Sequence, residues 1–378
     1  MSQALPPLSL YVHIPWCIRK CPYCDFNSHV ASQVIPETAY VKALQQDIDL
    51  QLAGTHQRKL VSIFFGGGTP SLFSASAIAS VLDYAEQKIG FAADIEITLE
   101  ANPGAAEQGQ FRDYRSAGVN RLSIGVQSFN QQRLEQLGRI HNSRDAVTAI
   151  EAARSAGFDN FNIDLMHGLP GQTASAALAD LQQAITLSAR HISWYQLTIE
   201  PNTVFYKHPP LLPNDDQLAD IQEHGEQLLS EHGYDNYEIS AFSQPGNSAR
   251  HNLNYWQFGD YLGIGAGAHS KLTSMQGDIS RHWQTRLPED YLDTGKAFTA
   301  GRRTLGPDEL PLEFAMNALR LKEGFSPALF AARTGLGFEV LVPAINRLIE
   351  RGLLEPDRSQ IRTSLQGRRF LNDTLAEF

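Results

Sequence analysis

The chain has 378 residues and carries 31 Lys and Arg against 41 Asp and Glu, a formal net charge of −10 with neutral histidines. Hydrophobic residues make up 42% and charged residues 19%, so the chain has the material for a large core and wholesale disorder is excluded. The acidic balance argues against a nonspecific nucleic-acid binder, because phosphate contacts need clustered Lys and Arg, but it leaves room for a local basic pocket.

The start of the chain carries no targeting signal. Met1-Ser-Gln-Ala-Leu-Pro-Pro7 lacks the cationic and apolar segments of a signal peptide. No run approaches the roughly 20 apolar residues of a membrane span. We therefore expect a cytoplasmic protein without a transmembrane segment, and leave open peripheral membrane contact and a homodimer.

Short β-branched runs alternate with longer helical patterns from residue 8 to about residue 240. The expected strands are Leu8–Ile14, Leu60–Phe65, Ile95–Glu100, Arg121–Val126, Phe161–Met166, Ser193–Ile199 and a shorter one at Tyr237–Ser240. The expected helices are Glu37–Leu52, Ala75–Lys88, Gln108–Ser116, Ser143–Ser155 and Ser175–Leu187. This order predicts parallel pairing with right-handed crossovers. Six such units are too few for an eight-stranded barrel, so we predict an α/β fold with a partial, open (β/α)6 barrel.

Beyond about residue 300 the pattern changes to amphipathic helices and a short hairpin. The expected helices are Pro311–Lys322, Ser326–Thr334 and Phe338–Arg351, and the expected hairpin is Gly352–Thr363. We predict three units: the barrel with its site at 1–240, a Gly-rich segment covering the barrel at 241–300, and a smaller C-terminal helical, winged-helix-like module at 301–378. This module has no visible chemistry, and we interpret it as a lid, a dimer surface or a docking element.

The three cysteines of the chain, Cys17, Cys21 and Cys24, lie on one loop directly after the first strand. An odd number packed so closely is a poor disulfide framework and indicates metal chemistry in a reducing compartment. Three thiolates on one loop can bind three corners of a cubane Fe–S cluster and leave the fourth iron free for another ligand. The alternative is zinc with His13 or His29 as fourth ligand, although zinc knuckles favour two-residue gaps and this loop combines a gap of three with a gap of two.

Glycine-rich or polar motifs end the next strands. Phe64-Phe-Gly-Gly-Gly-Thr-Pro70 closes the second, and Glu100, Gln127 and Asp164 end the third, fourth and fifth, with Arg139 following Gln127 in the chain. Each motif alone is also explained by a turn, a helix cap or a surface residue. Their convergence on the carboxyl edge of one parallel sheet indicates a binding site.

The C-x-x-x-C-x-x-C pattern resembles the radical S-adenosylmethionine (SAM) superfamily, and the motifs together closely resemble its anaerobic coproporphyrinogen III oxidases, from Tyr11 through the Gly-rich segment at Gly263–Ser270. In that superfamily the unique iron of a 4Fe–4S cluster chelates SAM, and the reduced cluster cleaves it to a 5′-deoxyadenosyl radical. The resemblance implies that Cys17, Cys21 and Cys24 bind the cluster. It implies SAM contacts from Tyr11 near the cluster, from Gly67, Gly68 and Thr69 at the methionine, and from Glu100, Gln127, Arg139 and Asp164 around the ribose and carboxylate.

One position departs from the oxidases, which carry another cysteine two residues after the third cluster ligand, where this chain has Phe26. In this residue and in His251-Asn-Leu-Asn-Tyr255-Trp256 the chain resembles the heme chaperone HemW subgroup, in which the His-Asn-x-x-Tyr-Trp motif is associated with heme binding. A His beside aromatic rings can ligate heme iron while the rings pack on the porphyrin. The plain alternative is a hydrogen-bonded His at the barrel rim. Second-rank candidates are His269 and His282.

The resemblance therefore implies a heme chaperone that binds a 4Fe–4S cluster, SAM and heme, transfers heme to an acceptor hemoprotein, and has no assigned catalytic residue. One alternative is an oxygen-independent coproporphyrinogen III oxidase, which removes carbon dioxide from propionate side chains. Another is a radical SAM enzyme that acts on heme itself. A zinc-stabilised interaction protein, which needs no SAM, is the alternative outside redox chemistry.

Overall fold

The protein is described by a computed structural model that covers residues 4–31, 34–104 and 108–378. Residues 1–3, part of the segment on which the expected lack of a signal peptide rests, lie outside the described residues. The described chain is organised around a twelve-stranded sheet with the order β14-β13-β12-β11-β1-β4-β5-β6-β7-β8-β10-β9. Within these residues, no helix has both the length and the apolar character needed to span a membrane.

Six consecutive strands in the middle of this sheet are parallel and form the partial barrel. They are β1 Leu8–Ile14, β4 Leu60–Gly67, β5 Phe91–Ala101, β6 Arg121–Gln127, β7 Phe161–His167 and β8 His191–Gln196. These strands are rich in apolar residues because helices cover the outer face of a parallel sheet and side chains fill its inner face. The predicted α/β fold with a partial (β/α)6 barrel is confirmed.

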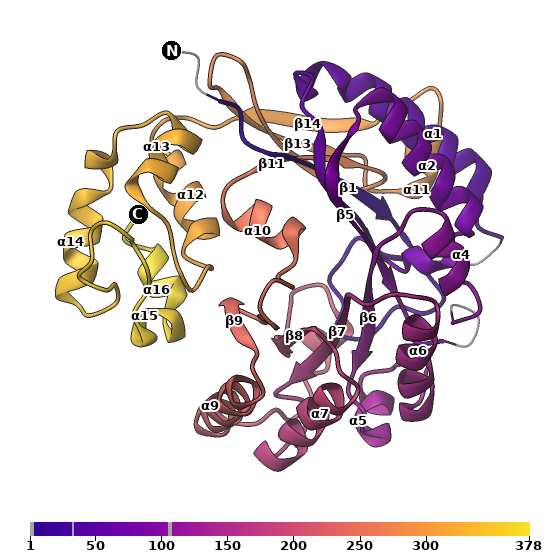
Figure 1. The fold of residues 1–378 in the computed structure, drawn as a ribbon, viewed down its shortest axis with the longest axis horizontal. Helices are drawn as coiled ribbons and strands as arrows, with labels where there is room; N and C mark the ends of the chain where they lie inside the picture. The colour runs from indigo at the N-terminus through magenta and orange to yellow at the C-terminus, as the bar shows by residue number, and fades with distance from the viewer. Residues whose placement is uncertain (1–3, 32–33, 105–107) are drawn as a thin grey trace.

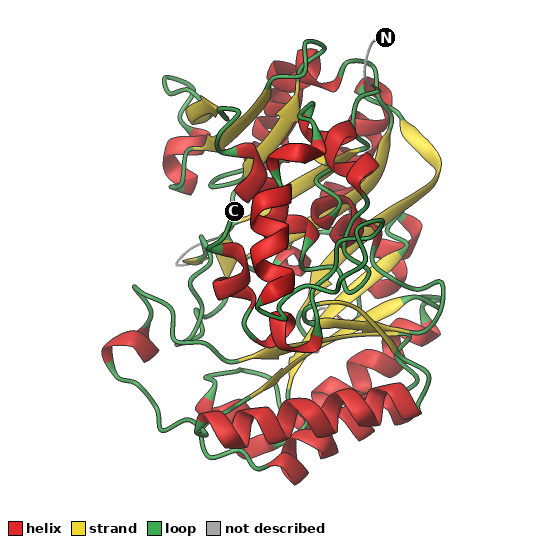
Figure 2. Cartoon of the chain, turned by 90° about the vertical axis from the view of Figure 1, so that its left-hand side faces the viewer, coloured by secondary structure: helices red, strands yellow, loops and turns green. Residues whose placement is uncertain are grey.

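Helices pack along the outer side of the curved sheet (Figures 1 and 2). They are α1 Glu37–Gln51, α2 Ala75–Lys88, α4 Phe111–Ser116, α5 Gln131–Gln136, α6 Ser143–Ser155, α7 Ala174–Thr186 and α9 Asp215–Glu231, with 3₁₀ turns at Leu52–Thr55 and Pro70–Leu72. The Ser74 side chain caps α2, and Asn142 with Asp145 forms a capping box at α6. These caps begin the helices where the sequence predicts them, and the bounds of α2 and α6 agree with the prediction.

The segment after β8 extends the sheet at both edges. Beside β8 lie the antiparallel strands β10 Ala241–Ser243 and β9 Asp235–Glu238, the latter close to the strand predicted at Tyr237–Ser240. Beside β1 lies the parallel strand β11 Asp260–Ile264, followed by the antiparallel strands β12 His269–Thr273, β13 Ile279–Gln284 and β14 Thr299–Thr304. Residues 260–304 thus add strands to the barrel sheet, which the sequence analysis did not predict. The short helix α11 Pro288–Leu292 separates β13 from β14.

The strand predicted at Ser193–Ile199 begins and ends earlier, at His191–Gln196. His191 pairs with Asn162 of β7, whereas the chain leaves the sheet after Gln196. Leu197 is buried instead in a small apolar cluster with Phe205. The following loop, predicted at residues 200–215, contains the short helix α8 Val204–Lys207.

Helices beyond residue 305 form a C-terminal module, which Figure 1 shows on the left, and its core also includes Phe258 and Ile279 of the preceding segment. They are α12 Leu310–Ala318, α13 Pro327–Thr334, α14 Val342–Glu350, α15 Leu365–Arg369 and α16 Leu371–Leu375. The helix α10 Arg250–Trp256 lies between this module and the barrel sheet (Figure 1). Arg281 on β13 binds Glu313 of α12 at 2.6 Å, which joins the extended sheet to the module.

Three predicted elements of the module are shorter than expected. The helix predicted at Pro311–Lys322 ends at Ala318. The helix predicted at Phe338–Arg351 is divided into a 3₁₀ turn at Phe338–Val340 and α14, because Pro343 has no backbone N–H and fits the first turn of a new helix. The hairpin predicted at Gly352–Thr363 is limited to one bridge between Leu354 and Thr363, since Ile361 pairs with Phe325 instead.

Candidate functional site

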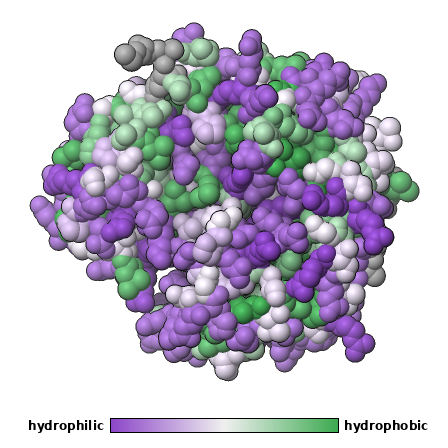
Figure 3. Space-filling model, in the orientation of Figure 1, coloured by the Kyte–Doolittle hydropathy of each residue, from purple (hydrophilic) through white to green (hydrophobic). Residues whose placement is uncertain are grey.

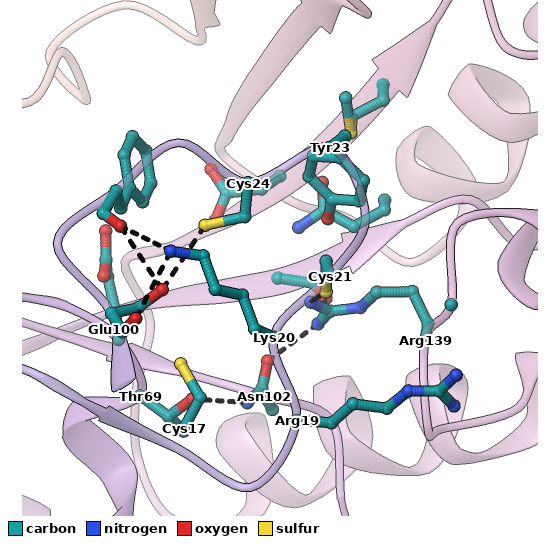
Figure 4. Close-up of a pocket in the computed structure, with 18 of the residues that line it drawn as sticks. Cys17, Arg19, Lys20, Cys21, Tyr23, Cys24, Thr69, Glu100, Asn102 and Arg139 are labelled. Carbon is teal, nitrogen blue, oxygen red and sulfur yellow. Dashed lines mark hydrogen bonds between the residues drawn. The ribbon is translucent and has the colours of Figure 1, made fainter. Parts of the chain in front are cut away.

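The carboxyl ends of the barrel strands open into a cleft of about 420 Å³, within the ~300–1,000 Å³ typical of ligand pockets. The loop after β1 forms one wall, and residues in the carboxyl-terminal parts of β4 to β8 and in the loops after them form the others (Figure 4). Cys17, Cys21 and Cys24 all line this cleft. The structure therefore brings the three predicted cluster ligands together at the sheet edge that the sequence indicated.

Backbone contacts fix the shape of the cysteine loop. The two-residue strand β2 Trp16–Cys17 pairs with β3 His29–Val30 and joins the two ends of the loop. Across the loop, the Lys20 ammonium donates to the carbonyl oxygens of Phe26 at 3.1 Å and Ser28 at 3.3 Å. The three thiols therefore lie on a loop that protein contacts hold in shape without a bound cluster.

The donor set fits a cluster better than a single zinc ion. Among the described residues, no three His, Cys, Asp or Glu side chains converge as ligands of one metal ion. In a cubane each thiolate binds a separate iron, so the sulfurs need not meet at one point. His13 is engaged by protein at both nitrogens, with Nδ1 at 2.9 Å from the Tyr11 hydroxyl and Nε2 at 2.9 Å from the Asn27 carbonyl oxygen. His29 Nε2 lies 3.3 Å from Asn27 Oδ1.

The glycines after β4 let the strand end approach the cysteine loop. A Cβ atom on Gly68 would lie 2.5 Å from the Trp16 carbonyl oxygen, so only glycine fits there. The Gly67 N–H donates to Glu100 Oε2 at 3.2 Å, and the Asn102 amide donates to Thr69 Oγ1 at 3.2 Å. Gly68 thus lies close to the backbone of the cysteine loop. Gly67, Gly68 and Thr69 all line the cleft.

Arg139 connects the cysteine loop with the ends of β5 and β6. Its Nη2 donates to Asn102 Oδ1 at 2.7 Å and to the Gly125 carbonyl oxygen at 2.8 Å, while Nη1 lies 3.6 Å from Cys21 Sγ. The buried Nε has no hydrogen-bond partner among the described residues. The guanidinium therefore brings positive charge beside a thiol and keeps a donor free for a ligand carboxylate.

Asp164 is held inside the barrel by hydrogen bonds from Ser123 Oγ at 2.9 Å and the Asn162 amide at 2.8 Å. Burial raises its pKa. Gln127 also lines the cleft and has a left-handed backbone with φ of 68°, a conformation that concentrates at functional sites. The sequence analysis missed Ser123, although Ser123, Gly125 and Gln127 recur every second residue on the same face of β6.

Tyr11 and His251 line a second cavity of about 190 Å³ inside the barrel, not the cysteine cleft. This inner chamber, as we call it, shares four lining residues with the cleft, so the two cavities adjoin. The shared residues are Glu100, Ser123, Asp164 and Tyr195. Tyr11 is predicted to lie near the cluster, but it is not among the residues that line the cleft with the cysteines.

His251 lies at the start of α10 and is buried against the barrel. Its Nδ1 is 3.0 Å from Glu96 Oε1, and its ring packs on Phe64 with centroids 4.3 Å apart. Glu96 Oε1 also accepts from the backbone N–H of Arg250 at 2.9 Å. His251 Nε2 makes no hydrogen bond with any described residue. Glu96 escaped the sequence analysis, although Glu96 and Glu100 lie on the same face of β5.

The second-rank histidines lie on the extended sheet. His269 is exposed on β12, where it pairs with Trp283 of β13. His282 Nε2 lies 3.0 Å from Ser280 Oγ. Neither histidine is among the residues that line the cleft or the inner chamber.

Replacing Glu100 by Gln should stabilise the cluster-free, SAM-free protein at pH 8 and leave its stability nearly unchanged at pH 5. Burial, and then the charge of Asp164, raise the Glu100 pKa from 4.5 to about 8. Between these values the folded state keeps a proton that the unfolded state releases, so rising pH costs stability, at most about 1.4 kcal/mol per pH unit. Thermal unfolding across this range should show a flatter profile for Glu100→Gln. Parallel curves for this variant and the exposed control Glu86→Gln would refute the prediction.

Comparisons with known proteins agree with the fold. The profile of the Radical SAM superfamily matches residues 11–184, and that of the HemN C-terminal domain matches residues 305–370. The heme chaperone HemW of Escherichia coli (strain K12) is 49% identical over 374 residues, covering 99% of this chain and 98% of that protein. The heme chaperone HemW of Bacillus subtilis (strain 168) is 36% identical over 384 residues, covering 98% of each chain. The structure of the Escherichia coli coproporphyrinogen III oxidase HemN, a radical SAM enzyme, matches with a TM-score of 0.81 at 24% identity, covering 99% of this chain and 90% of that one.

Proposed function

The chain belongs to the radical SAM superfamily and, within it, to the HemW family, and from this membership we propose that it is a heme chaperone. It binds a 4Fe–4S cluster, SAM and heme, and transfers heme to an acceptor hemoprotein. The observation that carries this proposal is the identity of 49% to a heme chaperone HemW along 99% of the chain. Phe26, at the position where the oxidases carry a further cysteine, supports it.

Cys17, Cys21 and Cys24 would hold the cluster, which supplies one-electron chemistry and an iron without a protein ligand. Arg139 has Nη1 beside Cys21 and an Nε without a hydrogen-bond partner among the described residues, so it suits the carboxylate of SAM. Glu100 and Asp164 offer carboxylates for the ammonium group and the ribose hydroxyls. The remaining SAM contacts in this proposal are Tyr11, Gly67, Gly68, Thr69 and Gln127.

His251 is the proposed heme ligand. Its Nδ1 is engaged by Glu96, which leaves Nε2 for a metal, in the way that a carboxylate commonly orients a ligating histidine. The inner chamber, at about 190 Å³, is smaller than the ~300 Å³ of the smallest ligand pockets. Heme ligation by His251 therefore requires α10 to move away from the barrel.

The division into units 1–240, 241–300 and 301–378 is part of the same proposal, as are a cytoplasmic location and a homodimer. Most of the core of the C-terminal module comes from residues beyond 304, which supports treating it as a unit, although Phe258 and Ile279 of the segment 241–300 pack in the same core. Its outer surface is the proposed docking element for the acceptor hemoprotein.

The function is tested by offering the anaerobically reconstituted protein two substrates with SAM present. Hemin should bind with a stoichiometric change in visible absorbance, and coproporphyrinogen III should yield no decarboxylated product. His251→Ala should bind hemin at least about tenfold more weakly and keep its iron and sulfide content, because His251 lines the inner chamber and is not among the residues that line the cysteine cleft. Vinyl products with matching 5′-deoxyadenosine would instead identify an oxidase, and unchanged heme affinity in His251→Ala would refute the ligand assignment.

A further inference from the structure

Three of the large hydrophobic side chains that line the cleft are more than half exposed. Ile18 is 53%, Phe26 60% and Ile140 53% exposed. On the face shown in Figure 3, hydrophobic residues form small separate patches among hydrophilic ones, and single exposed hydrophobic residues of this kind are normal. Three exposed hydrophobic side chains around one cleft differ from such isolated residues, because a ligand in the cleft could cover all three and remove their apolar surface from water. We call Ile18, Phe26 and Ile140 the apolar rim.

Two cations accompany the apolar rim. Arg19 and Lys20 also line the cleft, next to Ile18 in the chain (Figure 4). Lys20 is tied to the loop backbone, whereas Arg19 makes no hydrogen bond or ion pair with any described residue. Acidic residues such as Asp25 and Glu200 line the same cleft, so Arg19 offers an anion one free guanidinium and the cleft as a whole is not basic.

We propose that the apolar rim is the docking surface for the flat macrocycle of a tetrapyrrole, and that Arg19 pairs with one of its propionates. This inference rests on the proposed function, since heme is the tetrapyrrole concerned, and it adds a contact surface separate from His251. A tetrapyrrole is an apolar disc with carboxylates at one side, which matches apolar side chains and a free guanidinium around one opening. A protein partner would not need this match between a disc and a cleft mouth.

The apolar rim and the inner chamber have different roles in this arrangement. The chamber, at about 190 Å³, does not hold a macrocycle while α10 is closed, whereas the rim is open to solvent. The rim therefore binds the macrocycle without help from an iron ligand. Phe26 places an aromatic ring where the oxidases have a thiol, so this residue favours stacking on the macrocycle.

The test uses iron-free protoporphyrin IX, which cannot be ligated by His251, and its dimethyl ester, which lacks the charges. The full chain with its cluster reconstituted is titrated with each by fluorescence. Phe26→Ser and Ile140→Ser should each weaken protoporphyrin IX binding about tenfold, the scale of one buried apolar side chain. Arg19→Gln should weaken protoporphyrin IX and leave the dimethyl ester unchanged. The control Leu211→Ser, at a side chain 87% exposed outside the cleft lining, should change neither.

Unchanged protoporphyrin IX affinity in Ile140→Ser overturns the proposal, and so does an Arg19→Gln effect that is equal for acid and ester. Ile140 decides the matter if Phe26→Ser loses iron, because Ile140 lies outside the cysteine loop. Hemin titrations separate this proposal from the function. If the unmodified chain binds hemin through His251 while the rim variants behave like Leu211→Ser, only the rim is refuted. If the unmodified chain binds no hemin, the chaperone function fails first.

Discussion

Replacing Cys21 by Ser is expected to remove nearly all cluster iron and, with it, measurable SAM binding. A serine hydroxyl stays protonated at neutral pH and is a poor iron ligand, so the loop would retain only two thiolates for a cluster that needs three. The fold should persist, because Cys21 is only partly buried and is not part of the hydrophobic core. Iron and sulfide analysis after anaerobic reconstitution, together with equilibrium dialysis against SAM, measures both effects.

Ser28→Ala is the matched control for this experiment. Ser28 Oγ lies 3.7 Å from Cys24 Sγ on the same loop, so its loss perturbs the surroundings of a thiol and removes no proposed ligand. The control should keep its iron and its SAM affinity. A Cys21→Ser variant that retains a full iron complement would contradict the cluster assignment. So would an unmodified protein that binds zinc stoichiometrically and does not bind SAM.

The sequence predicted the cleft well because strand ends follow directly from the chain order. Parallel strands bring their carboxyl ends to one edge, so a cysteine loop after β1 and polar residues near the ends of β5 to β7 must lie together there. The same argument could not place Tyr11 or His251. Tyr11 lies in the middle of β1, and the direction of its side chain depends on how the barrel closes.

The strands β11 to β14 were missed for a related reason. The glycines of this segment suggest turns more than strands in the sequence. Gly265 and Gly267, with φ of 98° and 83°, do lie in the turn between β11 and β12, but strands flank that turn on both sides. Lys271, in the middle of β12, is buried and reads as a surface residue in the sequence. Its ammonium binds Asp260 Oδ1 at 2.9 Å, a partner eleven residues earlier, and such a pairing becomes visible only when the two strands are side by side.

Replacing Glu96 by Gln is expected to destabilise the protein by about 3–5 kcal/mol at pH 7, the cost of leaving a buried charge without its partner. Arg121 is buried, its Nε lies 4.0 Å from Glu96 Oε2, and its Nε and Nη2 have no hydrogen-bond partner among the described residues. The glutamine keeps an oxygen for the N–H groups of α10, but it presents an uncharged NH2 group to Arg121 in place of a carboxylate oxygen. Urea unfolding of the two proteins measures the difference.

The pH dependence separates this charge effect from a loss of packing. Burial alone raises the Glu96 pKa, but the hydrogen bond from His251 and the charge of Arg121 outweigh it and lower the pKa to about 2. The carboxylate therefore contributes stability that is complete above about pH 4.5 and is lost as the pH falls towards 2, and Glu96→Gln should lack this part of the acid transition. The control is Asp94→Asn, at a residue on the same strand as Glu96. It weakens the exposed ion pair between Asp94 and Arg250 of α10, in which the Asp94 side chain is 72% exposed, and should cost less than about 1 kcal/mol. Equal costs for the two variants would mean that Arg121 is compensated by something other than Glu96. A large difference would mean that one carboxylate on β5 holds both the buried guanidinium and the helix that carries His251.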